Sequence, residues 1–275
     1  MGSGRALLNS TALLTAVGML DDSREIRKDS GFWTFIRLIL YATAAIAIVA
    51  ALPSEIRIIP KVPMVLERCC LILVVVGFIN FVNFMDGMDW MTLVEVLPIG
   101  TAIIILFWLG LVPSDLALVA AALTGAMIGF VPFNKPVAKL FLGDAGSLPI
   151  GLILAWLILR IAAEGYHVAA FLLPLYYLAE TVITLAWRIW RRERFWEARR
   201  KHFYQIAKMS GASVLQVVGI VFLLNLVLAS LAVLTIKYDD WRVNAGALLA
   251  GALGVILVLT FFNRKQEALR VITSR

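Results

Sequence analysis

Apolar runs separated by short polar stretches follow one another along almost the whole chain. Most are about 20 residues long, which a helix needs to cross the hydrocarbon core of a bilayer, and none alternates strictly as an outer-membrane strand does. The pattern predicts an all-α protein, a polytopic transmembrane helix bundle of about nine spans that forms one domain over residues 1–275. The predicted spans are 6–20, 34–52, 65–82, 91–110, 114–131, 148–163, 168–187, 213–236 and 243–262.

Composition supports a membrane protein over a soluble one. Hydrophobic residues make up 61% of the chain and charged residues only 16%, less charge than an ordinary soluble domain carries. The net charge of +7 is better explained by basic cytoplasmic loops than by nucleic acid. We therefore expect membrane lipid, and no nucleic acid, among the partners. Cys69 and Cys70 are adjacent in an apolar run, and we expect both to be buried without a disulfide.

The segments between the predicted spans alternate between two faces. One face receives 18 of the 25 Lys and Arg residues when Arg37, near the start of the second predicted span, is assigned to it. Its segments are 21–33, 83–90, 132–147, 188–212 and 263–275. Because positive residues mark the cytoplasmic side, we expect a bacterial inner-membrane protein with this face in the cytoplasm. The same face holds five aspartates: Asp21, Asp22, Asp86, Asp89 and Asp144. Carboxylates at one aqueous surface suggest a divalent cation and a phosphorylated substrate.

Two loops have patterns of their own. The loop 53–64 has a short β-branched run and three prolines, which predicts a small extended or hairpin element. The loop 188–212 carries eight Lys or Arg residues, and we expect part of it to be an amphipathic helix on the inner membrane surface.

Asp21 and Asp22 end the first apolar run. Adjacent carboxylates point in different directions, so one would face a cation while the other orients a substrate or accepts its proton. The structural alternative is a solvated helix end.

A second motif has a polar residue at every third position, namely Asn80, Asn83, Asp86 and Asp89. This spacing predicts a polar stripe along one side of a helix. Such a stripe can bind phosphate, sugar hydroxyls, a metal or a nucleotide, or it can simply cap the helix where it leaves the membrane.

Asp144 lies between glycines in FLGDAGS, just before an apolar run. Small neighbours let a metal or phosphate approach the backbone, and Ser147 and the N–H groups of the following helix start can bind anionic oxygen. Lys135 and Lys139 lie upstream, where they could neutralise a pyrophosphate.

His202 is embedded in the basic loop, and its imidazole can hydrogen-bond a phosphate or a leaving group. The plain role of the loop is topology and attraction to anionic lipid.

Together these motifs resemble the polyprenyl-phosphate N-acetylhexosamine-1-phosphate transferase family (glycosyltransferase family 4). NFVNFMDGMDW at 80–90 is similar to the family signature Asn-x-x-Asn-x-x-Asp-Gly-x-Asp-Gly, with Trp90 in place of the last glycine. GMLDD matches the double-aspartate loop, and FNKPVAKLFLGDAGSL looks like Asn-x-x-Pro-Ala-x-x-Phe-x-Gly-Asp-x-Gly-Ser. EARRKHFYQ at 197–205 looks like the Ala-His-Arg-x-His-x-Tyr-Gln form of the O-antigen-initiating bacterial branch, with Arg199 where the first histidine would stand.

The resemblance implies transfer of a sugar 1-phosphate from a UDP-N-acetylhexosamine to undecaprenyl phosphate, with release of UMP. The branch implies lipopolysaccharide O-antigen or another cell-surface glycan. Mg²⁺ is the implied metal, with Mn²⁺ as an alternative, and a homodimer is the expected assembly. Family members usually have two further transmembrane helices before the double aspartate, so we expect this sequence to lack them.

The resemblance also implies a site. Its catalytic residues are Asp21, Asp22 and Asp144. Asp144 would be the main Mg²⁺ ligand, with one of Asp21 and Asp22 beside it, and Asp22 is our first assignment. The expected substrate-binding residues are Asn80, Asn83, Asp86, Asp89, Lys135, Lys139, Arg200 and His202.

Two other classes of function stay open at this point. A transporter would hold its carboxylates at mid-membrane depth. An inactive truncated scaffold would be insensitive to a UDP-sugar and Mg²⁺.

Overall fold

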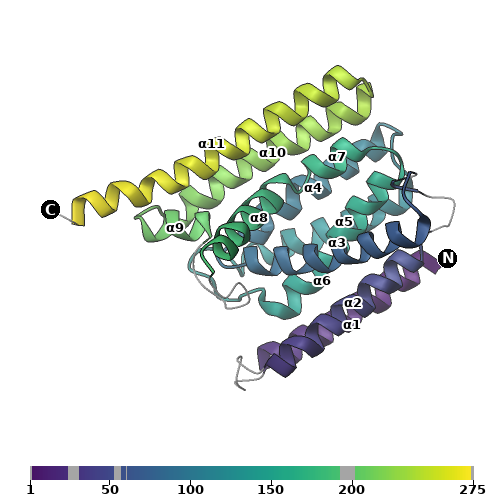
Figure 1. Ribbon diagram of the computed structural model, residues 1–275, viewed down its shortest axis with the longest axis horizontal. Helices are drawn as coiled ribbons and strands as arrows, with labels where there is room; N and C mark the ends of the chain where they lie inside the picture. Colours follow the sequence, from purple (N-terminus) through teal and green to yellow (C-terminus); the bar gives the residue numbers. More distant parts are fainter. Residues whose placement is uncertain (1, 24–30, 53–56, 60, 193–201, 274–275) are drawn as a thin grey trace. The chain divides into compact units, whose positions relative to one another are not determined.

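The computed structural model describes residues 2–23, 31–52, 57–59, 61–192 and 202–273. In this part of the chain the regular secondary structure is entirely helical, with eleven helices and no strand. The prediction of an all-α protein is confirmed (Figure 1).

Among the described helices, six are long and apolar enough to cross a membrane. The chain is therefore a multi-pass membrane protein. These helices are α2 (Gly31–Ala50), α3 (Met64–Met85), α4 (Met91–Trp108), α6 (Gly143–Ala163), α10 (Val214–Tyr238) and α11 (Trp241–Thr273).

Three of the nine predicted spans do not correspond to a helix that is both long and apolar enough to cross a membrane. The first becomes α1 (Gly2–Ser23), whose Ser, Thr, Asn and Gly residues make it less apolar than the six. The fifth becomes α5 (Ser114–Phe130), which is apolar but has only 17 residues. The run 168–187 is divided into α7 (His167–Leu172) and α8 (Leu175–Trp190). Pro174 lies between these two helices, and proline cannot donate the backbone hydrogen bond that would continue a helix.

The chain divides into two compact units, and each is described by itself. Unit 1 comprises Met1–Asp86 and Leu140–His167, with α1, α2, α3 and α6. Unit 2 comprises Gly87–Lys139 and Val168–Arg275, with α4, α5, α8, α9 (Phe203–Met209), α10, α11 and nearly all of α7.

In unit 1, α6 is the helix on which the others pack. It contacts α1 and α3 extensively and α2 to a smaller extent, while α1 and α2 lie side by side. The backbones of α1 and α6 approach closely at Gly18, where an added Cβ would lie 2.3 Å from the carbonyl oxygen of Asp144. Small residues permit such approaches between apolar helices. The contact sets the end of α1 against the start of α6.

The described part of the loop 53–64 holds turns and bends, so the predicted hairpin is absent from residues 57–59 and 61–63. The carboxylate of Glu67, in the first turn of α3, accepts the N–H groups of Ile58 at 2.7 Å and Ile59 at 2.9 Å. Arg57 pairs with the same carboxylate. Because these N–H groups bond to a side chain, they are not available to a neighbouring strand.

In unit 2, α4 packs against α5 and α10, and α10 runs beside α11 (Figure 1). The start of α4 is held by two side chains of other helices: Tyr177 donates its hydroxyl to the carbonyl of Met91, and Asn225 donates to that of Val94, each at 2.9 Å. Ser213 and Gln216 form a capping box that begins α10, as this residue pair commonly does.

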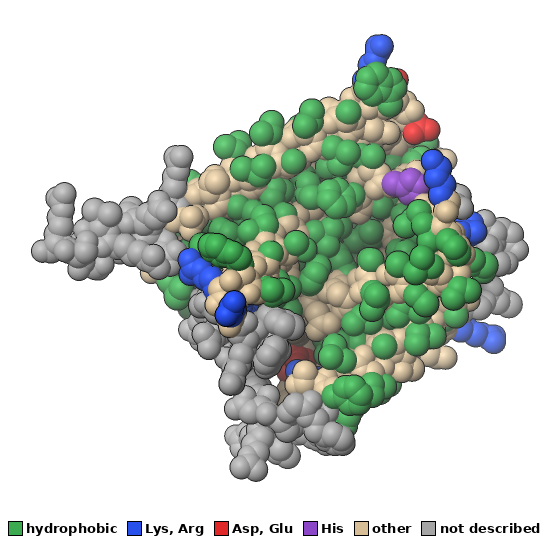
Figure 2. Space-filling view, in the orientation of Figure 1, with side chains coloured by type: hydrophobic (Ala, Val, Ile, Leu, Met, Phe, Trp, Pro, Cys, Tyr) green, Lys and Arg blue, Asp and Glu red, His purple; other side chains and the backbone are tan. Residues whose placement is uncertain are grey.

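Apolar side chains cover most of the face shown in Figure 2, with few charged side chains among them. Side chains such as Leu73, Leu223 and Leu257 are exposed, as expected where helices face lipid. Cys69 and Cys70 are also exposed, so the expectation that they are buried was wrong. Both occupy positions of α3 that the described helices leave uncovered.

Replacing Gly18 by alanine should force α1 and α6 apart, because the new methyl group meets backbone atoms that cannot rotate away. We expect a loss of stability of about 1–3 kcal/mol, measured as a lower thermal unfolding midpoint in detergent. Gly4→Ala is the matched control in the same helix, because a Cβ there meets nothing within 4 Å. Equal midpoints for the two variants would contradict the close helix contact.

Candidate functional site

An acidic cluster occupies one end of the helices of unit 1. Asp21 and Asp22 lie in the last turn of α1, and Asp144 is the second residue of α6. Asn83 lies in the last turn of α3, and Arg37 reaches the cluster from α2. Three of the five predicted aspartates therefore meet in this unit.

Arg37 connects two of these carboxylates. Its Nη1 hydrogen-bonds to Asp21 and lies 3.6 Å from Oδ2 of Asp144. Asp21 also accepts a hydrogen bond from the indole N–H of Trp33 at 2.8 Å. Burial opposes the charge of Asp21, but hydrogen bonds with Asp144 and Trp33 and the positive charge of Arg37 together hold its pKa below the usual value. Asp21 is thus a carboxylate kept ionised beside a fixed cation.

Asp22 has a different environment. Its two oxygens accept the backbone N–H groups of Asp144 at 3.1 Å and Ala145 at 2.9 Å. The helix start that the sequence suggests for phosphate is therefore occupied by a carboxylate of the protein itself, which is favoured there by the unpaired N–H groups. Gly143 has φ +62, and a Cβ on it would lie 2.5 Å from Oδ2 of Asp22. The glycine before Asp144 makes room for this bond.

The two asparagines of the predicted stripe also differ. Asn83 donates to Oδ1 of Asp144 at 2.7 Å and to the hydroxyl of Ser147 at 2.8 Å. Asn80 donates instead to the carbonyl of Val76, one turn back in its own helix. Asn83 belongs to the acidic cluster, while the amide N–H of Asn80 is used locally. Asp86 is the half-buried C-cap residue that directly follows α3.

In unit 2, the loop that follows the Asp-Gly pair bonds to the loop after α5. Asp89 accepts the N–H of Ala138 at 3.2 Å, and the N–H of Trp90 donates to Oδ1 of Asn134 at 2.7 Å. Trp90 stands at the family's glycine position and has φ 64, a conformation that glycine adopts without strain. Its indole N–H donates to the carbonyl of Val131, so hydrogen bonds hold this unusual tryptophan.

Lys135 and Lys139 are exposed on the loop that follows α5. Arg200 lies outside the described residues, as does the rest of 193–201. The described part of the predicted amphipathic helix is α9, which buries Phe203 and Ile206 and exposes Lys208. Its position relative to a membrane stays a prediction.

His202 immediately precedes α9 and is nearly buried. Its Nδ1 lies 2.6 Å from Oε2 of Glu180, a fully buried residue of α8. The same segment contacts the Asp-Gly motif, because a Cβ on Gly87 would lie 2.3 Å from the hydroxyl of Tyr204. Two motifs far apart in the sequence therefore meet in unit 2.

The described residues give no direct support for a preformed metal centre. Within the ranges that the structure describes, no group of three or more His, Cys, Asp or Glu residues is arranged to hold an ion. Mg²⁺ is usually bound by one or two carboxylates together with substrate oxygens and waters. The Mg²⁺ expectation therefore stays a prediction.

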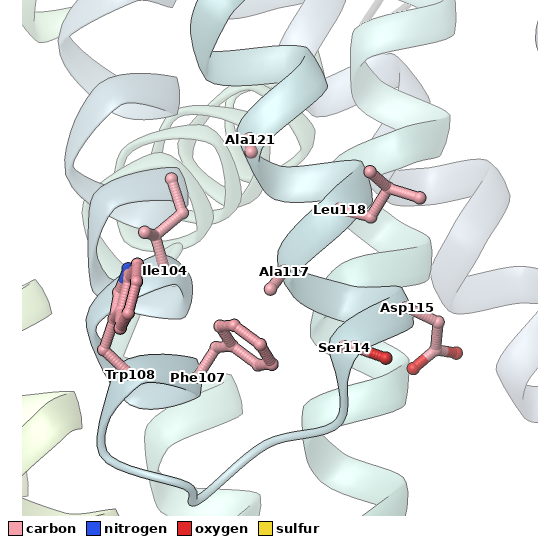
Figure 3. Close-up of a pocket in the computed structure, with 8 residues that line it drawn as sticks. All are labelled: Ile104, Phe107, Trp108, Ser114, Asp115, Ala117, Leu118 and Ala121. Carbon is pink, nitrogen blue, oxygen red and sulfur yellow. The ribbon is translucent and has the colours of Figure 1, made fainter.

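A pocket of about 560 Å³ lies elsewhere in unit 2, between the end of α4 and the start of α5 (Figure 3). Phe107, Trp108 and Leu118 form much of its wall, and Ser114 and Asp115 provide polar atoms at one side. Its lining includes no predicted site residue. With so few polar groups it does not suit a sugar nucleotide.

A comparison with protein families matches residues 5–162 to the model described as glycosyl transferase family 4. The chain belongs to glycosyl transferase family 4. The family match includes the whole acidic cluster of unit 1 and the loop residues Asp89 and Asn134, whereas Glu180 and His202 lie beyond it.

Curated family members that resemble this chain are named phospho-N-acetylmuramoyl-pentapeptide-transferase. The protein of Mycolicibacterium smegmatis is 35% identical over 139 residues, which make up 49% of this chain and 37% of the relative. That of Rhodococcus jostii is 36% identical over 135 residues, or 49% of this chain and 36% of the relative. The chain thus matches little more than a third of the length of these relatives. These names do not refer to O-antigen, so the O-antigen branch stays a prediction.

Sequence reasoning missed three charged residues that the structure places in polar contacts. Arg37, Glu95 and Glu180 all lie inside predicted spans. Glu95 of α4 is fully buried, and its Oε2 accepts a hydrogen bond from Asn225 at 2.7 Å. A charged residue inside an apolar run is costly and usually functional or paired, and that signal could have identified all three.

Replacing Asp22 by alanine should weaken the start of α6, because two N–H groups lose their acceptor. We expect a loss of about 0.5–2 kcal/mol, typical of a lost helix cap, measured by thermal unfolding with and without Mg²⁺. Ser23→Ala is the control, because in the described contacts the Ser23 hydroxyl donates to the Leu20 carbonyl of its own helix. The loss should be equal in both buffers. A loss confined to the Mg²⁺ buffer would identify Asp22 as chiefly a metal ligand.

Proposed function

We propose that this protein transfers a sugar 1-phosphate from a UDP-N-acetylhexosamine to undecaprenyl phosphate in a Mg²⁺-dependent reaction. The observation that carries the proposal is the acidic cluster of unit 1, formed by Asp21, Asp144, Asn83 and Arg37 in a chain of glycosyl transferase family 4.

The position of the cluster favours chemistry at a membrane surface. Asp21 and Asp22 lie in the last turn of α1, and Asp144 lies in the first turn of α6. A transporter would be expected to hold its carboxylates at mid-membrane depth. A water-soluble nucleotide and a lipid-linked phosphate can meet only where the hydrocarbon ends. Helix ends provide that location, and we assign it to the cytoplasmic side of a bacterial inner membrane.

The proposed reaction is a displacement at phosphorus. An oxygen of the acceptor phosphate attacks the phosphorus that carries the sugar. The bond from that phosphorus to the oxygen bridging it to the nucleotide breaks, and UMP leaves with that oxygen. Both reactants are anions, so fixed positive charge is needed to bring them together. Arg37 supplies one such charge at the cluster.

The residues present fit a Mg²⁺ site built on two carboxylates. Asp144 and Asp21 share Arg37 and are the best candidates to hold the ion, because their hydrogen-bond donors are side chains that can rotate away, whereas both oxygens of Asp22 accept backbone N–H groups of α6. Bound there, Mg²⁺ would neutralise phosphate oxygens as charge develops on them. Asn83 orients Asp144 through the 2.7 Å hydrogen bond, and Asp22 fixes the backbone that carries it.

Other roles rest on the family pattern. We assign the donor nucleotide and sugar to the remaining predicted residues, which are Asn80, Asp86, Asp89, Lys135, Lys139, Arg200 and His202. The O-antigen branch rests on EARRKHFYQ, and the choice of N-acetylhexosamine stays open. A homodimer and Mn²⁺ as a substitute metal are further expectations from the family.

Asp144→Asn should reduce transfer by at least about 100-fold, because the amide cannot replace a carboxylate among phosphates and cations. The measurement is appearance of radiolabel in the lipid fraction with purified protein, Mg²⁺, undecaprenyl phosphate and a panel of UDP-N-acetylhexosamines. EDTA should abolish the wild-type signal.

Asp115→Asn is the control for this experiment, because Asp115 is exposed in α5 and outside the proposed machinery. Both variants should insert and purify normally. Near-normal turnover of Asp144→Asn would refute the site. No transfer by the wild type with any donor, and no stabilisation by UDP-sugar and Mg²⁺, would instead favour an inactive scaffold.

A further inference from the structure

We propose that Glu180 is a positioning residue that keeps a proton on Nδ1 of His202 and so reserves Nε2 for the substrate. This inference rests on the proposed transferase function and goes beyond it, because it divides the histidine into a structural and a reactive nitrogen. Glu180 lies in an apolar run of α8 and matches none of the motifs that identify the family.

Both oxygens of Glu180 are used on the same segment. Oε2 lies 2.6 Å from Nδ1 of His202, and Oε1 accepts the backbone N–H of Phe203 at 2.7 Å. An ionised carboxylate can only accept hydrogen bonds, so in the proposed pair with a charged Glu180 it is Nδ1 that donates. Of the two ring nitrogens, Nε2 is then the one that can gain or lose a proton.

The ring is held by more than this pair. The N–H of His202 is directed at Oε1 of Gln205, and the ring lies 5.9 Å from that of the fully buried Tyr204. Gly87 packs against the ends of Tyr204 and Gln205. His202 is therefore fixed, within unit 2, against Tyr204, the residue whose hydroxyl group Gly87 approaches.

If Glu180 served only to hold the backbone in place, a carboxylate would not be required. Burying a carboxylate fully costs free energy, because the group loses its hydration, unless hydrogen bonds or an opposite charge offset that cost. The backbone of Phe203 needs only one acceptor oxygen, which a glutamine would also provide. A carboxylate is required, however, if the imidazole must keep Nδ1–H and be stabilised when Nε2 takes a proton. The same division of roles operates in the Ser-His-Asp triad, where the aspartate sets the tautomer of the histidine.

The substitution Glu180→Gln distinguishes a purely structural role of Glu180 from control of the His202 tautomer. The amide oxygen can still accept the N–H of Phe203, so the segment should remain in place. The amide NH₂ would then face Nδ1 and turn it into an acceptor, which moves the proton of the neutral ring to Nε2. The variant should thus fold while presenting the wrong nitrogen.

Nitrogen NMR of histidine gives the direct test. The chain has two histidines, and His167→Asn leaves His202 as the single labelled residue. In the neutral ring we expect Nδ1 to be protonated in this background and Nε2 to be protonated after Glu180→Gln. Glu164→Gln is the matched control, because that exposed glutamate, which directly follows α6, pairs only with Arg160 in the described contacts, and it should leave the spectrum unchanged. A protonated Nε2 in the background protein, or no change in Glu180→Gln, would overturn the inference.

Transfer kinetics supply the second readout. We expect kcat of Glu180→Gln to fall by about 10²–10⁴-fold, as for other wrong-tautomer variants, with KM for undecaprenyl phosphate and the thermal unfolding midpoint nearly unchanged. Glu164→Gln should keep full activity. A reversed tautomer with unchanged kcat would refute the positioning role but leave the transferase proposal intact. A wild type without transfer would refute the transferase proposal, while the NMR result would still decide which nitrogen Glu180 protonates.

Discussion

A carboxylate among apolar helices must find hydrogen-bond donors, because its loss of hydration is otherwise too costly. Unit 1 meets this requirement with donors from several helices. Asp22 takes two N–H groups from the start of α6, Asp144 takes the amide of Asn83, and Asp21 takes Trp33 and Arg37. Each bond also ties one helix end to another. The interactions that make the acidic residues tolerable are therefore the ones that define the geometry of the cluster.

The same constraint has a different outcome in unit 2, where two fully buried glutamates lie within helices. Glu95 is paired with Asn225, and Glu180 binds both the imidazole of His202 and the backbone beside it. These bonds connect α4 to α10 and α8 to the start of α9. In unit 1 the carboxylates of the acidic cluster lie at helix ends. In unit 2 the buried carboxylates act on neighbouring side chains and backbone.

Several motif residues turn out to have steric or conformational roles. Gly143 has a positive φ and leaves room for the carboxylate of Asp22, and Gly87 leaves room for the hydroxyl of Tyr204. Trp90 adopts a left-handed conformation where the family pattern has glycine, and its two N–H groups are both bonded. A motif glycine can thus report a backbone requirement of the fold, while the neighbouring polar residue carries the chemistry.

The hydropathy of the sequence alone determined most of the membrane-spanning helices and the positions of the acidic residues at their ends. Six of the predicted spans are candidate membrane helices, and Asp21, Asp22 and Asp144 gather at helix ends as expected. These features follow from local properties, namely the free energy of transferring each segment into hydrocarbon and the points where apolar runs end.

Only the tertiary structure decided which partner each polar group has. Asn83 bonds to Asp144, whereas Asn80 bonds within its own helix. Asp22 accepts N–H groups of the α6 backbone. Arg37 and Glu180, which lie in apolar runs, pair with Asp144 and His202. The Asn83–Asp144 bond joins residues 61 positions apart, and the Asp22 bonds join residues 122 and 123 positions apart. Such pairings depend on which helices pack together and at what rotation, because a side chain reaches only the neighbours that this packing brings within a few ångströms.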